Sequence, residues 1–206
     1  EGNVIWNAGE AIQVVSDAVI RNNLILNSDV GITAAPHVQV ALMRNVTIVN
    51  NTIYGHETGV YVRWANAANM VLANNAIYCP AGTAVNGSGL TTATVEANYV
   101  QGLLSGVSLG GAAFVSGGSA DSAFVDPRGF DFWLTPTSAL RGRAAPGSVP
   151  PLDFNGTTRT APYDVGAYER EGLNVNPGWR VGPGFKSDSA LLDATPPESV
   201  RDLSGR

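Results

Sequence analysis

The hydrophobic and polar positions of this 206-residue chain recur in blocks of three short apolar runs separated by polar turns. Each block is marked by an asparagine that lies between two runs rich in β-branched residues. The five marker asparagines are spaced 20, 28, 24 and 23 residues apart, and they are Asn3, Asn23, Asn51, Asn75 and Asn98. Three short strands in a repeat of this length predict a parallel β-helix, in which each block forms one coil.

The runs predict three sets of strands. The first set precedes the markers and comprises Ala18–Arg21, Val46–Val49, Met70–Ala73 and Thr94–Glu96. The second set follows the markers and comprises Leu24–Leu26, Thr52–Tyr54 and Ala76–Tyr78. The third set comes after a loop and comprises Ala11–Val15, Gly31–Ala34, Gly59–Trp64 and Thr83–Asn86.

Successive coils of a β-helix pair in parallel about 4.8 Å apart, so that equivalent residues lie above one another. Two inward aliphatic stacks are predicted, one of Ile20, Ile48, Leu72 and Val95, the other of Ile12, Ile32, Val60 and Val85. The marker asparagines should also stack inward, each amide bonding the amides above and below it. Turn chemistry explains a single Asn-Asn pair. Repeated pairs in register favour a ladder.

The aligned segments, such as VTIVNNTIYGHETGVYV from Val46, resemble the pectate-lyase-like superfamily of right-handed parallel β-helix proteins. The resemblance covers about the first 100 residues and implies an all-β fold, a right-handed parallel β-helix with an irregular capping segment. It assigns no function, because the same coils occur in lyases, hydrolases, epimerases and structural fibres.

Three parts are predicted: coils over residues 1–120, a cap over 121–170 and a linker over 171–206. The stretch LDFNGTTRTAPYDVGAYE from Leu152 resembles the end segment of exported bacterial β-helix proteins, although residues 137–141 depart from its usual form. This resemblance implies a cap that folds back over the last coil, with Phe132, Trp133 and Leu134 facing the core. We also expect further coils before Glu1, because an uncovered terminal coil exposes strand edges.

The last residues, ATPPESVRDLSGR, resemble the linker and first strand that open fibronectin type III modules. A net charge of -5 argues against a nucleic-acid partner, which requires a basic surface. The longest apolar runs fall short of the roughly 18 residues that cross a membrane, so no membrane insertion is expected. The lone Cys79 cannot form an intrachain disulfide and is expected to be a small filler of the coil. The resemblance to exported proteins implies an extracellular or cell-surface location.

Candidate chemistry gathers on the outer face of the third strand set. In enzymes of the pectate-lyase-like superfamily the substrate lies along such a face and the loops that precede it. By alternation the strands should turn four side chains outward, namely Gln13, Thr33, Tyr61 and Arg63. The loops should add four more, namely Glu10, Asp29, His56 and Glu57.

A base, a carboxylate, a phenol and a guanidinium converge at one place on this face. A uronate lyase needs a base that removes the proton α to a carboxylate and a cation that neutralises that carboxylate. The predicted catalytic residues are therefore His56, Glu57 and Arg63, and the predicted substrate-binding residues are Tyr61, Trp64, Asp29 and Gln13. Mixed polar residues are also what any solvated coil presents. Trp64 suits a sugar ring and the edge of the coil equally well.

Other functions stay open at this point. Asp29 and Glu57, one coil apart, supply the two carboxylates that a hydrolase needs. Asp153, Asn155 and Asp164 are too few to assign a calcium site, and no cofactor or metal ligand set is identified. We expect a fragment of an exported protein that binds or processes acidic polysaccharide, with lyase- or epimerase-like chemistry. The competing class is a non-catalytic surface or adhesion β-helix acting as a rigid spacer. A charged groove over residues 59–64 would favour an enzyme, and a flat, evenly polar face would favour a spacer.

Overall fold

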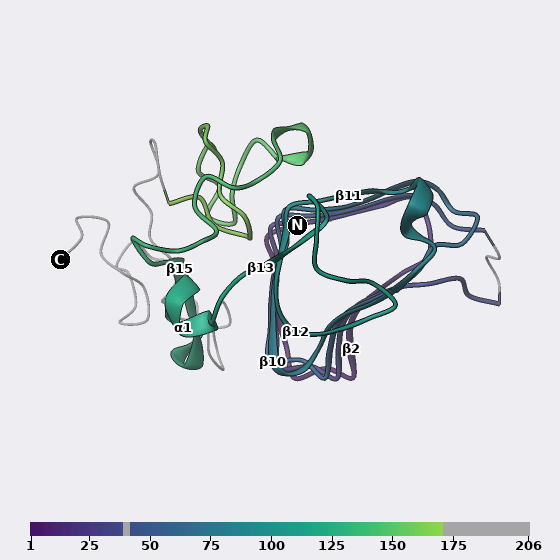
Figure 1. Ribbon diagram of the computed structural model, residues 1–206, viewed down its shortest axis with the longest axis horizontal. Coiled ribbons are helices and arrows are strands. Elements are labelled where there is room, and N and C mark those ends of the chain that lie inside the picture. Colours follow the sequence, from purple (N-terminus) through teal and green to yellow (C-terminus); the bar gives the residue numbers. More distant parts are fainter. Residues whose placement is uncertain (39–41, 171–206) are drawn as a thin grey trace, which may run out of the picture.

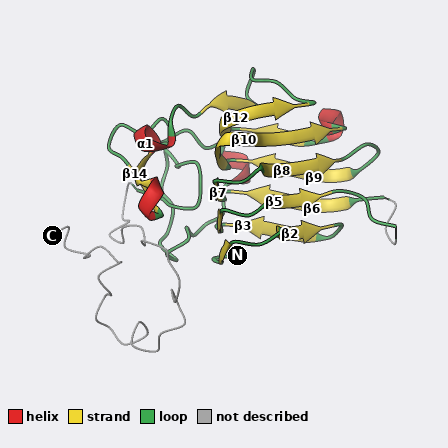
Figure 2. Cartoon of the chain, turned by 90° about the horizontal axis from the view of Figure 1, so that it is seen from below, coloured by secondary structure: helices red, strands yellow, loops and turns green. Residues whose placement is uncertain are grey.

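The structure is a computed structural model that describes residues 1–38 and 42–170. The predicted linker and fibronectin-like opening, residues 171–206, lie outside the described residues. The chain winds into a stack of coils. Figure 1 looks along the stack and shows three flattened sides. Figure 2 turns it so that the coils lie one above another.

The strands that precede the marker asparagines form a four-stranded sheet along one side of the stack. Its members are β3 (Ala18–Arg21), β6 (Arg44–Val49), β9 (Ala68–Ala73) and β11 (Thr94–Glu96). All neighbours in this sheet pair in parallel. The predicted first strand set is therefore confirmed.

The second and third strand sets belong to one nine-stranded sheet that covers the other two sides. The second set is β1 (Val4–Trp6), β4 (Leu24–Leu26), β7 (Thr52–Tyr54), β10 (Ala76–Ser88), β12 (Asn98–Ser105) and β13 (Phe114–Ser116). The third set is β2 (Glu10–Val14), β5 (Val30–Ala34) and β8 (Thr58–Arg63), continued by the second halves of β10 and β12. A short 3₁₀ helix, Leu90–Thr92, interrupts the fourth coil.

The sequence predicts two strands, Ala76–Tyr78 and Thr83–Asn86, where the structure has the single strand β10, which continues through the corner. In the preceding coils the equivalent corner residues, Asn27 and Gly55, have positive φ values of 46° and 77°, which end the strand. In the β10 coil this place is taken by Cys79, which is fully buried in the main core. Burial raises the pKa of the Cys79 thiol to about 12. The residue is a packed filler, and its thiol stays protonated.

The inward stacks follow the predicted register. Ile48 pairs with Ile20 on one side and Leu72 on the other, and Leu72 pairs with Val95. On the third side Ile12, Ile32, Val60 and Val85 pair in the same order. These side chains belong to one hydrophobic cluster that fills the coils. Burial of such columns is the main favourable term for the stack.

The marker asparagines form a continuous hydrogen-bonded ladder, as predicted. Each Nδ2 donates to the Oδ1 of the next marker, over 3.1, 2.8, 3.0 and 2.9 Å from Asn3 through to Asn98. Each backbone N–H donates to the same Oδ1. In the interior coils the second Nδ2 hydrogen reaches backbone carbonyls, such as Ile20 O from Asn51. Buried amides satisfied in this way stabilise the corner instead of costing free energy.

The last described part of the chain, residues 120–170, lies beside the coils (Figures 1 and 2). We call it the side segment. It contains α1 (Ala120–Ala123), an antiparallel pair of β14 (Phe124–Asp126) and β15 (Asp131–Leu134), and 3₁₀ turns at Pro127–Gly129 and Pro146–Ser148. The prediction that this segment folds back over the last coil is wrong, because it covers the outer face of the second strand set.

The reason lies in the side chains that the second strand set turns outward. Leu24, Leu26, Ala76 and Tyr78 are at most 1% exposed, and they form a second hydrophobic cluster with the aromatic residues of the side segment. The Tyr78 and Phe124 rings meet edge to face, 5.0 Å apart. Phe132, Trp133 and Leu134 are buried as expected, but in this lateral cluster. A strand that is apolar on both faces needs a cover on both faces.

Candidate functional site

The outer face of β2, β5, β8 and the second half of β10 carries the predicted polar row. Strand register aligns Gln13, Thr33, Tyr61 and Asn86 on successive coils. Gln13 is exposed and Tyr61 is partly exposed. Thr33 is only 7% exposed, and its hydroxyl donates to Glu10 Oε1 over 3.0 Å. The outward alternation is therefore confirmed, with Glu10 bonded to Thr33 at one margin.

Arg63 and Tyr61 form a connected polar arrangement on this face. The Arg63 guanidinium carbon lies 4.0 Å from the centroid of the Tyr61 ring. Nη1 donates to Val62 O and Asn86 O over 2.9 and 3.1 Å, and Nη2 donates to Asn86 Oδ1 over 2.9 Å. A cation over an aromatic ring is attracted by its quadrupole, which here keeps the guanidinium flat against the face. These bonds use three of the five guanidinium N–H groups. Asn86 was not recognised in the sequence, although its register with Tyr61 follows from the repeat.

His56 does not belong to this face, and the prediction that it points outward is wrong. It is only 3% exposed, its Nε2 lies 2.9 Å from Ile25 O, and its Nδ1 lies 3.0 Å from Ser28 N and 2.9 Å from Ser28 O. A proton on Nε2 lets the ring donate to Ile25 O and accept from Ser28 N, so this tautomer satisfies both nitrogens. Burial lowers the pKa of His56, so the ring is neutral near pH 7. The absence of a side chain at Gly31 makes room for the ring.

Replacing His56 with alanine should therefore destabilise the fold. The substitution leaves the Ser28 N–H unbonded in the coil interior and removes one partner of the Ile25 carbonyl, at a cost of about 2 kcal/mol. Urea denaturation at pH 7 measures this loss. Glu57→Ala is the control, because Glu57 is the exposed neighbour and its truncation should change stability by less than about 0.5 kcal/mol. Equal stability of the two variants would show that the imidazole bonds contribute nothing.

Trp64 also turns away from the candidate face. It is fully buried in the main hydrophobic cluster. The sequence left two roles open for Trp64, stacking on a sugar ring or packing at the edge of the coil. The structure supports packing, because the buried ring has no exposed face on which a sugar could stack. Trp64 follows Arg63 directly, so the alternation of the strand turns it inward.

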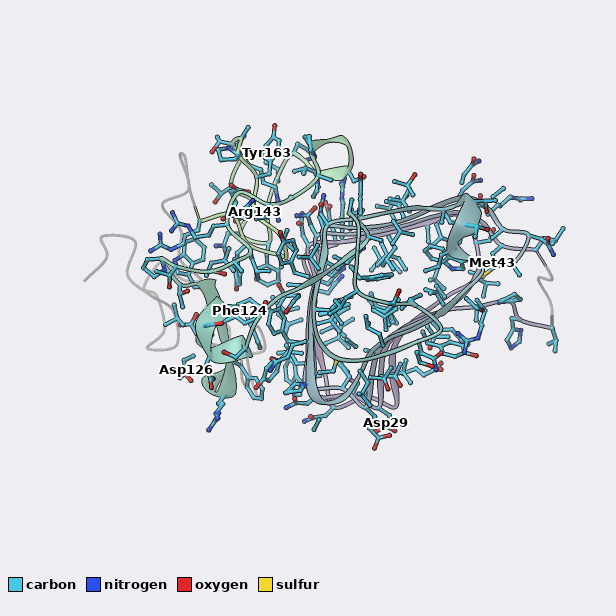
Figure 3. All side chains as sticks on the ribbon, in the orientation of Figure 1. Asp29, Met43, Phe124, Asp126, Arg143 and Tyr163 are labelled. Atoms are coloured by element: carbon cyan, nitrogen blue, oxygen red, sulfur yellow. The ribbon has the colours of Figure 1, made fainter. Side chains whose placement is uncertain are left out.

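Asp29 and Glu57 occupy one row on adjacent coils. The pairing of Val30 with Thr58 aligns the residues that precede them. Both side chains are exposed, and Asp29 points away from the coil in Figure 3. Adjacent parallel strands are about 4.8 Å apart, which sets the separation of the two backbones. Two carboxylates thus lie at the margin of the face where the strands begin. Arg63 is the last residue of β8, at the opposite end of the strand.

The residues considered for calcium serve other purposes. Asp153 accepts from the amides of Asn155, Thr157 and Glu169, and Asp164 accepts from those of Gly142 and Arg170. Both carboxylates therefore close turns of the side segment. Within residues 1–38 and 42–170, His, Cys, Asp and Glu form no group of three that could hold a metal ion. The described helices include none long and apolar enough to cross a membrane.

Two open clefts lie at the β12 end of the stack, and neither is lined by a residue of β8. The larger, of about 550 Å³, is lined by residues of 88–114, and the second, of about 420 Å³, by residues of 100–118. The groove that would favour an enzyme was expected over residues 59–64, and these clefts do not supply it. The candidate face has charged residues at both margins, Asp29 and Glu57 at one and Arg63 at the other, and neutral polar residues between them.

The fold and its asparagine ladder define the chain as a parallel β-helix protein, a β-solenoid with about four turns. The chain matches no protein-family model, no curated protein and no solved structure.

Proposed function

We propose that the chain is part of an exported β-helix protein of the pectate-lyase-like superfamily that binds acidic polysaccharide at the cell surface or outside the cell. The binding surface is the outer face of β2, β5, β8 and β10. The observation that carries the proposal is the Arg63 guanidinium, held over Tyr61 and bonded to Asn86 on the next coil.

This arrangement suits a uronate. A guanidinium is the side chain best matched to a carboxylate, because its N–H groups are coplanar and can bond both oxygens. Holding Arg63 against the ring reduces the side-chain entropy that binding would otherwise remove. Gln13 and the Tyr61 hydroxyl add neutral hydrogen-bonding groups for sugar hydroxyls along the same row.

The proposal concerns binding rather than turnover. A lyase or epimerase requires a base beside the α-proton, and the imidazole expected to act as that base is buried with both nitrogens bonded to backbone. Glu57 and Asp29 stay at the margin of the face, where they favour one orientation of an acidic ligand by repelling its carboxylates.

A rigid spacer is the second candidate function. The coils are buttressed on the inside by the aliphatic stacks and on one outer side by the side segment. The contacts of Arg63 with Tyr61 and Asn86 also connect neighbouring residues and coils on the outer face. A spacer requires no ligand on the candidate face, so a binding measurement separates the two functions.

Isothermal titration with de-esterified oligouronates tests the proposal. We expect binding by the unaltered protein, weakened by added salt, and at least a tenfold loss of affinity in Arg63→Ala, about 1.4 kcal/mol. Arg44→Ala is the matched control. Arg44 is an exposed arginine that pairs with Asp17, and its strand, β6, belongs to the four-stranded sheet and not to the candidate face. Equal heats from the unaltered protein and Arg63→Ala would remove the proposal and leave the spacer.

A further inference from the structure

The side segment is tied to the coils by the first asparagine of each Asn-Asn pair. Asn22, Asn50 and Asn74 have φ values of 51°, 51° and 58°, and this left-handed conformation turns their side chains outward while the marker points inward. Asn50 Nδ2 donates to Asp164 O and Gly166 O over 3.1 and 3.2 Å. Asn74 both donates to and accepts from Ala145. Each of these Asn-Asn pairs therefore bonds neighbouring coils through its second, inward asparagine and the side segment through its first, outward asparagine.

One buried guanidinium is the centre of this junction. The Arg159 side chain is fully buried, and its Nη2 bonds Asn22 Oδ1, Gly166 O and Ala167 O over 3.1, 2.8 and 3.0 Å. Its Nη1 bonds Glu169 Oε2 over 3.1 Å. Arg159 thus connects Asn22 of the coil with Gly166, Ala167 and Glu169 of the side segment.

Three carboxylates lie in the buried part of the junction. Asp153, Asp164 and Glu169 are at most 4% exposed, and the Arg159 guanidinium bonds Glu169 among them. Asp153 and Asp164 each accept backbone amides at both oxygens. Glu169 accepts the Asp164 amide and Arg159 at Oε2, and its buried Oε1 has no hydrogen-bond partner within residues 1–38 and 42–170. Unlike its neighbours, Glu169 therefore has one oxygen on which a negative charge is not stabilised.

The described coil residues that bond the chain around Glu169 do so through neutral groups. These are the amides of Asn22, Asn50 and Asn74 and the Thr52 hydroxyl, which accepts from Ala167 N. The coil carboxylate Glu96 bonds the side segment at Ser148. From β15 the junction receives the Leu134 carbonyl, which accepts from Arg170 Nε. Among residues 1–38 and 42–170, the charged groups around Glu169 are thus Arg159, Asp164 and Asp153 of its own segment, with Arg170 at the margin.

We propose that Glu169 is a proton-dependent latch: a proton on its unpartnered oxygen strengthens the docking of the side segment on the coils, and loss of that proton weakens it. Ionisation places a negative charge on a buried carboxylate that has hydrogen-bond donors at one oxygen only. Protonation removes that charge and leaves the Arg159 bonds to the backbone carbonyls and Asn22 in place.

The direction of the pH dependence follows from the burial. Burial, with the Asp164 charge second, raises the pKa of Glu169 to about 7, from the ordinary value of 4.5 that applies in the undocked or unfolded chain. Between these two values the docked state binds more protons than the undocked state. The contribution of Glu169 to docking is therefore largest below pH 4.5 and decreases as the pH rises towards 7, by at most about tenfold in the opening equilibrium per pH unit.

Hydrogen exchange of the intact chain tests the latch. The Gly166 and Ala167 amides bond Asn74 O and Thr52 Oγ1 across the junction, so their protection reports docking. After correction for intrinsic exchange, we expect their protection to fall at least tenfold between pH 5 and pH 7.5 in the unaltered protein. In Glu169→Gln, which keeps the shape and carries no charge, protection should be constant over this range.

His56 titrates in the opposite sense, since burial lowers its pKa and acid therefore destabilises the coil. The comparison with Glu169→Gln removes this contribution, because His56 is present in both proteins. Glu57→Gln, at an exposed position, is the control and should behave as the unaltered protein. The same pH dependence in the unaltered protein and Glu169→Gln overturns the proposal. So does a carboxyl titration of Glu169, followed by carbon NMR, with a midpoint near 4.5.

Discussion

Replacing Asn51 with alanine is expected to lower the free energy of unfolding by about 4 kcal/mol, since each buried polar group left unbonded costs roughly 1–3 kcal/mol. Asn51 accepts from Asn23 N and Nδ2, and donates to Asn75 Oδ1, Ile20 O and Val49 O. Its position is fully buried, so water cannot replace these bonds. Urea denaturation followed by far-ultraviolet circular dichroism measures the loss.

An exposed asparagine provides the control for this prediction. Asn69 Nδ2 donates to Asn45 Oδ1 over 2.8 Å in a second stack on the outside of another corner. Its φ of 56° disfavours alanine, so Asn69→Ala should cost about 1 kcal/mol. If both variants lost the same stability, the interior ladder would contribute no more than the backbone conformation of one residue.

Replacing Arg159 with alanine is expected to cost about 3–5 kcal/mol at pH 8, because removal of one partner leaves a buried charge uncompensated. The Glu169 carboxylate would then lie in the junction with its guanidinium partner removed. The loss should be measured by thermal or urea unfolding, together with increased exchange of the Gly166 amide.

Two further variants make this second prediction specific. The double variant Arg159→Ala/Glu169→Gln should recover part of the stability, since the neutral amide removes the unpaired charge. Arg128→Ala should change stability by less than about 0.5 kcal/mol, because Arg128 and its partner Asp121 are 82% and 65% exposed. A loss in Arg159→Ala as small as that in Arg128→Ala would contradict a structural role for the buried pair.

The candidate face shows which of its residues a repeat can predict. Tyr61 and Gln13 lie in one row because strand pairing has a period of two and successive coils repeat it. His56 lies in a turn, where no alternation applies, and its inward direction depends on the space above Gly31 and on the carbonyl of Ile25. Asn86 is in register with Tyr61, whereas Ser88 is in register with Arg63, so only the path of the guanidinium selects Asn86 as its partner.

The side segment shows a signal that was present in the sequence and was not used. The runs LIL and AIY have no charged or strongly polar position, and TIY has only Thr52, whereas a strand with one solvated face alternates. This pattern predicts a cover on the outer face of the second strand set. It does not say which residues supply the cover, because the contact between Tyr78 and Phe124 spans coils and side segment and depends on how the chain leaves β13.

By itself, the sequence determined the β-helix, its strand register, its inward aliphatic stacks and its asparagine ladder. These features repeat along the chain, and parallel stacking turns a repeat directly into contacts between equivalent residues. Only the tertiary structure decided the lateral position of the side segment, the inward turn of His56, and the buried junction of Arg159 with Asn22 and Glu169. Each of these depends on contacts that occur once along the chain, most of them between residues far apart, and no periodicity encodes them.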